Sequence, residues 1–440
     1  PKGHKLVLYV FALTFINMDN AIQSFELGPE NEPQLLKQFK SFQRQYLTVY
    51  LAVMGADWIQ GPYLYKLYNS YNLDLTQIAM LFLTGFVSGA FAGTAVGSLA
   101  DTWYSMTIIN NTYFTLIKRK KNPPKKGTLI NNYALLFLSH VLSGLATALM
   151  YSVFESWYVS EHTSRGFPAE WRARTFALAT LLNSVVAILA GLLANSLVDI
   201  WGFRAPYIAS MGLICFVATM VVTTWTENYG SNESTNVDLL KTLKGGLSTM
   251  VKSKNIMVIG IAQTFFECAM YIFVLLYIPA IENATKGGDL PFGYLFSTMM
   301  VAVMVGSMTF QLFERQAKTG PRFFMECKED KLLTMALGLA SCAFMAMAYH
   351  GNSSTTILLM SYHLFEFTTG LYYPSISSLK AEEIPEETRA AVMTLLRIPM
   401  NLSVGIIMWH VEDMSTAMMF SICGIMTSVG CFLVIAFYGN

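Results

Sequence analysis

Long apolar segments are the feature that most restricts how this chain can fold. A helix needs about 20 apolar residues to cross the hydrocarbon core of a bilayer. Inside that core each backbone polar group needs an internal partner, which a helix supplies. We predict a spanning helix for each of these apolar runs: Tyr46–Tyr68, Gln77–Leu99, Ala134–Tyr158, Phe176–Leu197, Tyr207–Trp225, Ile256–Ile278, Phe292–Phe313, Leu332–Tyr349, Thr356–Ser378, Ala390–His410 and Ala417–Tyr438.

Composition agrees with a membrane protein and excludes several other classes. Hydrophobic residues make up 54% of the 440 residues and charged residues only 13%, against about 25% charged residues in soluble domains. The net charge of +1 provides no basic field for nucleic acid. The six cysteines are scattered without a C-x-x-C pair, so we expect neither a metal site nor a disulfide framework.

The motifs of the common soluble enzymes are missing from the sequence. It contains no Walker loop, no H-E-x-x-H pattern and no G-x-S-x-G pattern. We therefore expect no catalytic residues, no cofactor and no transport driven by ATP hydrolysis on this chain.

Basic residues fall in alternate loops and set the predicted orientation. Lysine and arginine concentrate in the cytoplasmic loops of membrane proteins. Here they concentrate before the first run, after the third, in the middle loop and in two later loops, the last of which carries Lys380 and Arg389. Both ends of the spanning body are therefore predicted to be cytoplasmic. The glycosylation-type triplets Asn283-Ala284-Thr285 and Asn352-Ser353-Ser354 then lie outside.

Two further segments are less regular. Leu6–Ile22 is a short apolar segment that would form an extra span, a signal anchor or a surface helix. Tyr104–Ile117 stands where the third of twelve spans is required, but it is short and polar, and a basic cluster that would lie outside follows it. Either the third span is degenerate, or residues 101–131 are not native coding sequence. We favour the second explanation, which sequencing the transcript would test.

Four acidic residues inside the predicted spans reveal an internal repeat. Asp57 and Glu155 are 98 residues apart, and Glu267 and Glu366 are 99 residues apart. The polar segment 226–255 separates the two pairs. We therefore predict four regions along the chain: an N-terminal apolar segment and linker (1–43), a six-helix bundle (44–225), a cytoplasmic middle loop (226–255) and a second six-helix bundle (256–440).

The intramembrane acids are candidates for a substrate cavity. A carboxylate in hydrocarbon is costly unless it faces water or a partner. Asp57 and Glu267 lie about 11 residues into their spans, near mid-depth, which favours a cavity role. Glu155 lies closer to the cytoplasmic end, where an ion pair with Arg172 or Arg174 is an equally good explanation.

Other polar residues in the spans complete the candidate site. Arg397 would bind an anion through two hydrogen bonds or neutralise Glu366. Lys66 would attract anions at the outer end of the first span or only extend its ammonium group toward water. His363 lies three residues before Glu366, and such a pair can relay protons. The remaining candidates for the cavity are Gln60, Tyr63 and Asn401.

The repeat and several strings of residues resemble a known family. Two similar halves with a site between them at mid-membrane are typical of major facilitator proteins. Individual strings are similar to the eukaryotic molybdate-anion transporters of that superfamily, from about Phe39 to the C-terminus with an interruption at about Thr102–Leu129. These strings are Ala56–Tyr68, Phe154–Tyr158, Phe167–Trp171, Gly370–Ser375, Ile384–Glu386, Arg397–Pro399 and Phe420–Cys423.

The resemblance implies an all-α major facilitator fold, with two six-helix bundles around a central cavity. It also implies uptake of molybdate across the plasma membrane. Two departures from the pattern concern function. Gly97 and Asp101 match the superfamily's gating loop, but the basic residues that should follow are absent, and His140 stands where the family tends to have an arginine. We retain Gly97 and Asp101 as the gating loop, and His140 with Lys66 as candidates for anion attraction.

The predicted protein is thus a monomeric, multi-pass carrier in the lipid bilayer that takes up molybdate by secondary active transport, without nucleic-acid partners. A dianion and an acidic cavity are compatible if some carboxylates are protonated, so that protons enter with the anion. A broader substrate range is another explanation. The alternatives are a carrier of another metabolite or ion, a membrane sensor or scaffold that transports nothing, and an intramembrane enzyme.

Overall fold

The computed structural model describes residues 33–95, 129–225, 239–286, 290–319, 329–351 and 354–438. The secondary structure of these residues is entirely helical, with short turns between the helices. The described part of each predicted apolar run falls on a helix, as expected from the sequence. Leu6–Ile22, Tyr104–Ile117, Gly97 and Asp101 lie outside the described residues.

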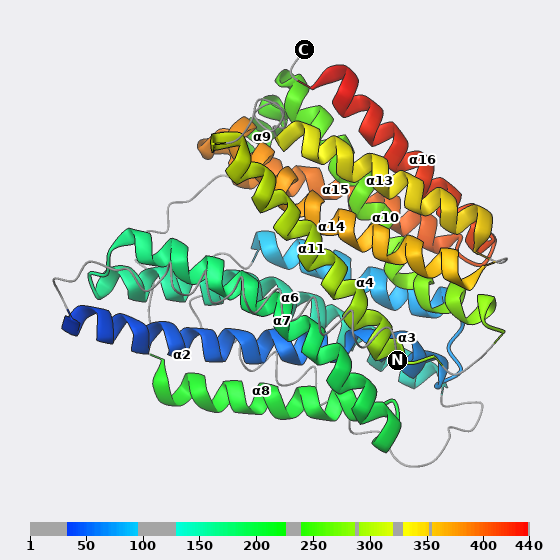
Figure 1. Cartoon of the computed structure of the whole chain (residues 1–440), viewed down its shortest axis with the longest axis horizontal. Coiled ribbons are helices and arrows are strands. Elements are labelled where there is room, and N and C mark those ends of the chain that lie inside the picture. The colour runs from blue at the N-terminus through cyan, green and yellow to red at the C-terminus, as the bar shows by residue number, and fades with distance from the viewer. Residues whose placement is uncertain are drawn as a thin grey trace.

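The helices form two layers, one from each half of the chain (Figure 1). In the view of Figure 1 the C-terminal helices lie above most of the N-terminal ones. The described N-terminal helices are α2 (Pro33–Trp58), η1 (Gly61–Tyr63), α3 (Leu64–Asn69), α4 (Leu75–Ala95), α6 (Leu129–Ser164), α7 (Ala169–Trp201) and α8 (Ala205–Thr224). The C-terminal helices are α10 (Lys254–Ala284), α11 (Phe292–Thr319), α13 (Glu329–His350), α14 (Thr355–Glu383), η3 (Glu386–Thr388), α15 (Arg389–Trp409) and α16 (Thr416–Phe437).

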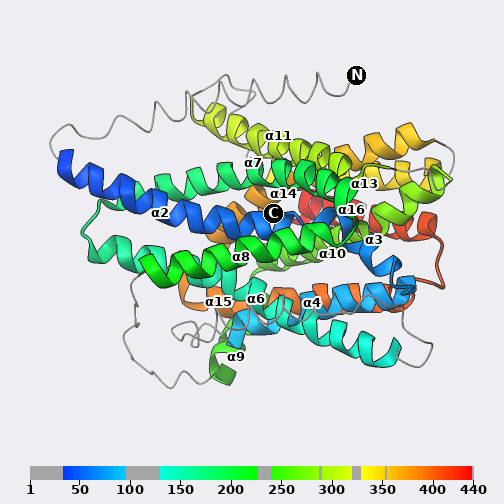
Figure 2. The ribbon, with the colours of Figure 1, turned by 90° about the horizontal axis from the view of Figure 1, so that it is seen from below.

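The middle segment contains a helix where the sequence predicted only a polar loop. This helix, α9 (Leu239–Lys252), precedes α10 and contacts α15, η3 and α10. Figure 2 shows it at the edge of the molecule, outside the main bundle.

The first predicted span is not one continuous helix. The apolar run Tyr46–Tyr68 is divided between α2, the 3-10 turn η1 and α3. Pro62 explains this break, because proline has no backbone N–H to donate to the preceding turn of an α-helix. The residues after Trp58 therefore change direction, and the polar side chains of this segment point to several neighbouring helices.

Hydropathy divides the helices into two kinds. By length and composition, seven of the described helices can cross a membrane, and α4 and α6 contain shorter apolar stretches. The helices α2 and α14 are not among them. They carry the intramembrane acids Asp57 and Glu366, so two of the four helices that the sequence repeat singled out are among the more polar ones.

Two helix pairs make the most extensive contacts between the two halves. The pair α7 and α11 lies on one side of the molecule, and the pair α4 and α15 on the other (Figure 2). Close approach of α7 and α11 depends on glycine: a Cβ atom added to Gly191 would lie only 2.7 Å from the Gly293 carbonyl oxygen. Ser297 of α11 also donates a hydrogen bond to the Ile188 carbonyl oxygen of α7 at 2.8 Å. Both contacts lie toward the outer ends of these helices in the predicted orientation.

Gly191→Ala should therefore disturb the closed outer end. The added methyl group would meet backbone atoms that cannot move aside, and overpacking of this kind costs about 1–3 kcal/mol. We expect transport to fall roughly tenfold, because the halves must close on this side during each cycle. Gly212→Ala is the matched control, since nothing lies within 4 Å of the added atom. Equal uptake rates for the two variants would show that this close approach is not required.

Candidate substrate site

Glu267 lies in a polar cluster of the C-terminal half. It stands on α10 and is half-buried. The Tyr372 hydroxyl of α14 donates a hydrogen bond to Glu267 Oε1 at 3.3 Å. The Tyr372 ring stacks on Phe266, with ring centroids 3.8 Å apart. Gln263, one turn earlier on α10, also hydrogen-bonds the carboxylate, while its buried Oε1 has no hydrogen-bond partner among the described residues.

Two cations face this carboxylate. Lys380 of α14 and Arg397 of α15 both interact electrostatically with Glu267, and Lys380 also interacts with Arg397. Lys380 is only 7% exposed, whereas Arg397 is exposed. The ion pairs formed by the described residues include neither cation. This cluster thus brings two cations toward one carboxylate, without a close ion pair that would occupy either cation.

Lys380 is the residue of this cluster that sequence reasoning missed. It was assigned to a basic cytoplasmic loop, whereas the structure places it within α14. A helical pattern would have found it, because Glu366, Tyr373 and Lys380 are seven residues apart and share one face. Burial of a lysine is uncommon without a partner or a ligand. Lys380 is therefore a stronger candidate for a binding residue than its predicted place in a loop suggests.

Arg397 and Asn401 lie on the face of α15 that approaches the N-terminal half. Gly405 marks this face, since an added Cβ atom would lie 3.7 Å from Leu83 of α4. Residues four apart on a helix share a face, which places Arg397, Asn401 and Gly405 in one row. The structure provides no ion pair between Arg397 and Glu366 within the described residues. The described guanidinium interactions are instead with the Glu267 cluster.

Glu366 is a separate, buried carboxyl group. It is 8% exposed and forms no hydrogen bond with another described side chain, although Tyr277 of α10 interacts with it electrostatically. His363 does not pair with it: its Nε2 lies 2.9 Å from Thr298 Oγ1, and its Nδ1 lies 2.8 Å from the Leu359 carbonyl oxygen. The predicted relay between His363 and Glu366 therefore has no direct contact in this conformation.

The N-terminal half contributes two further acids. Asp57 and Glu155 are both exposed, and neither belongs to an ion pair of the described residues, so Glu155 does not pair with Arg172 or Arg174 there. Glu155 lies close enough to Tyr50 of α2 to interact with its hydroxyl group. Because Tyr50 and Asp57 are seven residues apart on α2, they share one face. The two acids therefore belong to the same side of the N-terminal half.

Gln60 and Tyr63 connect the broken first span to its neighbours. Gln60 Nε2 donates a hydrogen bond to Ser210 Oγ of α8 at 2.8 Å. The Tyr63 hydroxyl donates to Asn195 Oδ1 of α7 at 2.7 Å and accepts from the Gly293 N–H of α11 at 3.4 Å. The Gln60 amide is thus engaged within its own half, whereas Tyr63 joins the two halves near their outer ends.

An ion pair between the halves also lies at the outer side. Lys66 of α3 pairs with Glu282 of α10, and its Nζ lies 5.7 Å from the centre of the Phe292 ring. The Thr76 N–H of α4 donates a hydrogen bond to Glu412 Oε1 at 3.4 Å. These contacts indicate that the side predicted to face outward is closed. In Figure 1 the two layers separate toward the opposite end, which carries the start of α2 and helix α9.

Glu282→Gln should weaken this outer closure. Both side chains are 22% exposed, so a contribution of about 1 kcal/mol, or roughly a fivefold shift in population, is appropriate for the ion pair. A membrane-impermeant maleimide should modify Ser297→Cys, placed in the α7–α11 contact, several times faster in this variant. Lys286→Gln is a control on the same side of the molecule. An unchanged labelling rate would mean that the pair does not hold the outer side closed.

His140 is held by aromatic neighbours on the N-terminal side. Its Nε2 lies 2.7 Å from the Tyr68 hydroxyl, and its ring centroid lies 6.2 Å from that of Phe82. Gly85 of α4 allows this approach, since an added Cβ atom would lie 3.3 Å from His140 Nδ1. His140 therefore helps to pack α6 against α3 and α4, and its role in anion attraction stays a prediction.

Sequence comparisons identify the family. A family model described as sugar transporters with 12 transmembrane segments matches residues 10–354. A molybdate-anion transporter of Xenopus tropicalis is 30% identical over 395 residues, which cover 88% of this chain and 83% of that protein. A molybdate-anion transporter of Danio rerio is 31% identical over 402 residues, with 85% and 80% covered. The chain belongs to the molybdate-anion transporter family. The family prediction made from the sequence strings is therefore confirmed.

Comparison with solved structures confirms the fold of this family member. The crystal structure of the nucleoside transporter NupG aligns with a TM-score of 0.65 at 13% identity, covering 91% of this chain and 99% of that one. The D-xylose–proton symporter aligns with a TM-score of 0.64 at 13% identity, with 91% and 97% covered. The chain is thus a multi-pass membrane protein with the major facilitator fold, as predicted.

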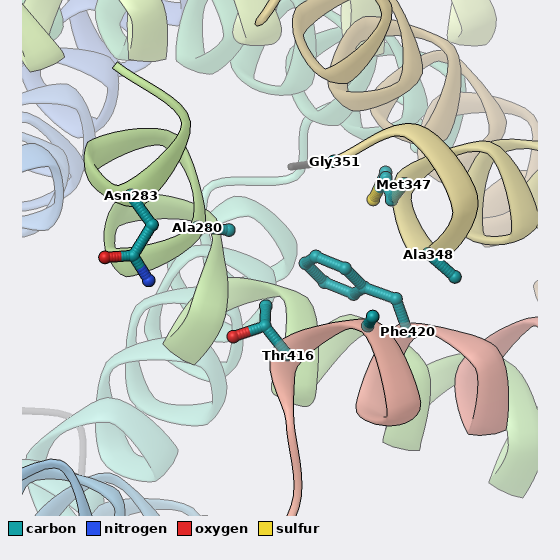
Figure 3. Close-up of a pocket in the computed structure, with 8 residues that line it drawn as sticks. Ala280, Asn283, Met347, Ala348, Gly351, Thr416 and Phe420 are labelled. Carbon is teal, nitrogen blue, oxygen red and sulfur yellow. The ribbon is translucent and has the colours of Figure 1, made fainter. Parts of the chain in front are cut away.

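A small pocket in this transporter-family protein has a lining that includes none of the Glu267 cluster. Figure 3 shows it near the end of α10, the end of α13 and the start of α16, with Phe420 and Met347 on one side and Asn283 on the other. Its lining contains no charged side chain. It therefore provides no cation for an anionic ligand, and the Glu267 cluster is the better candidate for the substrate.

Proposed function

We propose that this protein imports molybdate, or a closely similar tetrahedral oxyanion, across the plasma membrane by alternating access between its two halves. The names of its relatives support this substrate class. The observation that carries the proposal is that Lys380 and Arg397 both interact electrostatically with one carboxylate, that of Glu267. A dianion entering a membrane protein needs cations that are already in place, because bringing them from water at that moment would cost their hydration.

The cluster offers different kinds of hydrogen-bond donors to such an anion. Arg397 can present two parallel N–H groups, which suit two oxygens of one anion. Lys380 provides a compact point charge from the opposite helix. The Tyr372 hydroxyl and the Gln263 amide now face Glu267, and small rotations would turn them to the ligand. Asn401 and Asp57 would face the same central space from the two halves.

A sugar is the second candidate substrate, because the matching family model is described as sugar transporters. Sugars are neutral, and a sugar site needs hydrogen-bonding groups rather than uncompensated cations. The pair of Lys380 and Arg397 therefore favours an oxyanion. The two substrates also predict different competitors in one assay.

Radioactive molybdate uptake tests the proposal in cells that lack their own molybdate transporter, with surface expression of this chain measured in parallel. We expect saturable uptake that tungstate inhibits and glucose and xylose do not. Sugar uptake without molybdate uptake would replace the anion proposal with the sugar alternative. Uptake of neither, at a confirmed surface level, would overturn both substrate assignments while leaving the fold unaffected.

A further inference from the structure

Helix α9 carries two parallel stripes of different chemistry. In a helix, residues at spacings of three and four lie on one face. One such stripe in α9 is apolar and the adjacent stripe, one residue further on, is mostly basic. The apolar stripe consists of Leu240, Leu243, Leu247 and Val251, and the basic stripe of Lys241, Lys244, Ser248 and Lys252. The established transport fold does not require this pattern.

The face of α9 opposite the lysines packs on the protein. An added Cβ atom at Gly246 would lie 2.6 Å from the Ala391 Cβ atom of α15, so the two helices are in close contact. Met250 packs against a buried cluster that includes Val392 and Leu396 of α15. The position of α9 on the C-terminal half is therefore fixed by its contact with the first turns of α15.

The described side chains of the two stripes, in contrast, remain open. Leu247 is 47% exposed and Val251 is 64% exposed. Lys244 and Lys252, beside them, are exposed as well. Exposing two large aliphatic side chains to water next to lysines costs free energy and adds no stability to the fold. In a membrane protein this combination is typical of a helix that lies in the plane of the bilayer interface.

We propose that α9 lies in the cytoplasmic interface of the bilayer and that its lysine stripe binds the headgroups of anionic lipids. Leu247 and Val251 would enter the boundary of the acyl chains, while Lys244 and Lys252 reach the phosphate layer. The predicted orientation places α9 on the cytoplasmic side, where the leaflet carries negative charge and attracts juxtamembrane lysines. Figure 2 shows α9 at the edge of the bundle, where lipid has access to it.

The apolar stripe decides between lipid and other anionic partners. A free phosphate ion would engage the lysines but would leave Leu247 and Val251 in water. An acidic peptide would need apolar residues of its own to cover them. A phospholipid has an anionic headgroup for the lysine stripe and an acyl chain for the apolar stripe beside it. One lipid molecule can therefore cover both stripes.

This lipid contact would also bear on transport. Helix α9 rests on the first turns of α15, and Arg397 follows two turns later on the same helix. A lipid-bound α9 would restrain the cytoplasmic end of α15. We therefore expect the rate of exchange in proteoliposomes to rise severalfold when anionic lipid is added.

Fluorescence of a labelled α9 tests the lipid contact without any transport measurement. Val251→Cys would be labelled with an environment-sensitive dye, on a full-length background in which the native cysteines are replaced by alanine. The protein is placed in nanodiscs of phosphatidylcholine, with or without phosphatidylserine. With phosphatidylserine we expect a blue-shifted emission and strong quenching by lipids that carry a nitroxide in the upper part of the acyl chain. The dye at Ser248→Cys, on the lysine stripe, should be quenched less.

Charge variants then test the headgroup contact. In Lys241→Gln/Lys244→Gln/Lys252→Gln, quenching with phosphatidylserine should fall to the level in phosphatidylcholine alone, whereas Lys331→Gln, an exposed cytoplasmic lysine outside α9, should change nothing. Quenching that is equal in both lipids would overturn the binding of anionic headgroups. A dye at Val251→Cys that stays in water in both bilayers would overturn the whole proposal and leave the stripes for a protein partner.

Discussion

Replacing Lys380 by glutamine should lower molybdate uptake about 100-fold at equal surface expression. Hydrogen bonds to charged groups contribute about 1.5–3 kcal/mol each, which corresponds to roughly a 10- to 150-fold change in binding. The upper part of this range is expected here, because Lys380 is buried and no water can replace its charge. Glutamine keeps a hydrogen-bond donor of similar reach, so the loss reports the charge rather than the packing.

Arg397→Lys tests the second cation of the same site. Lysine keeps the charge but not the planar pair of donors, and we expect an intermediate loss of roughly tenfold. Lys380→Arg should likewise retain more uptake than Lys380→Gln. Lys331→Gln serves as the control for the loss of a lysine charge outside the candidate site. Wild-type uptake by the Lys380→Gln variant, with saturation and tungstate inhibition intact, would remove Lys380 from the substrate site.

The spanning helices could be predicted from the sequence because each of them depends on a strong local pattern, a long apolar run. An apolar run of 20 residues has few alternatives to a spanning helix, and the described part of each predicted run falls on a helix in the structure. The break of the first span lies at Gly61-Pro62, a pair that often marks a turn, and the prediction of one continuous span did not take this pair into account. The repeated spacing of the acids then indicated two related halves. The comparison with solved structures confirms the corresponding fold.

The candidate site was less accessible, because its contacts join distant parts of the chain. Glu267 meets Tyr372, Lys380 and Arg397, which come from two helices more than 100 residues later. No local pattern specifies such pairings. Polarity within a span also did not by itself identify the residues of the site. The Gln60 side chain, for example, donates a hydrogen bond to α8 instead of facing a substrate. The sequence shows which polar residues lie within the spanning runs, but only the packing of helices shows which face they occupy.

Glu267→Gln should separate exchange from net uptake. When the anion leaves, Lys380 and Arg397 need another negative charge, and Glu267 is the carboxylate that both of them face. Without it, the empty carrier would return with two uncompensated cations. A buried charge that loses its partner costs about 3–5 kcal/mol, so the return step should slow by at least roughly 100-fold. Exchange of internal for external molybdate does not require the empty carrier to reorient and should continue.

Proteoliposomes loaded with molybdate measure the two modes on one preparation. We expect the Glu267→Gln variant to exchange labelled molybdate at a rate within a few fold of the unmodified protein, while net uptake into empty vesicles is nearly abolished. Glu382→Gln, at an exposed acid near the C-terminal end of α14, should retain both modes. Loss of exchange together with net uptake would show that the carboxylate is required while the anion is bound. Retention of net uptake would show that the cations find another partner, and Glu366 or Asp57 would then become the carboxylate to test.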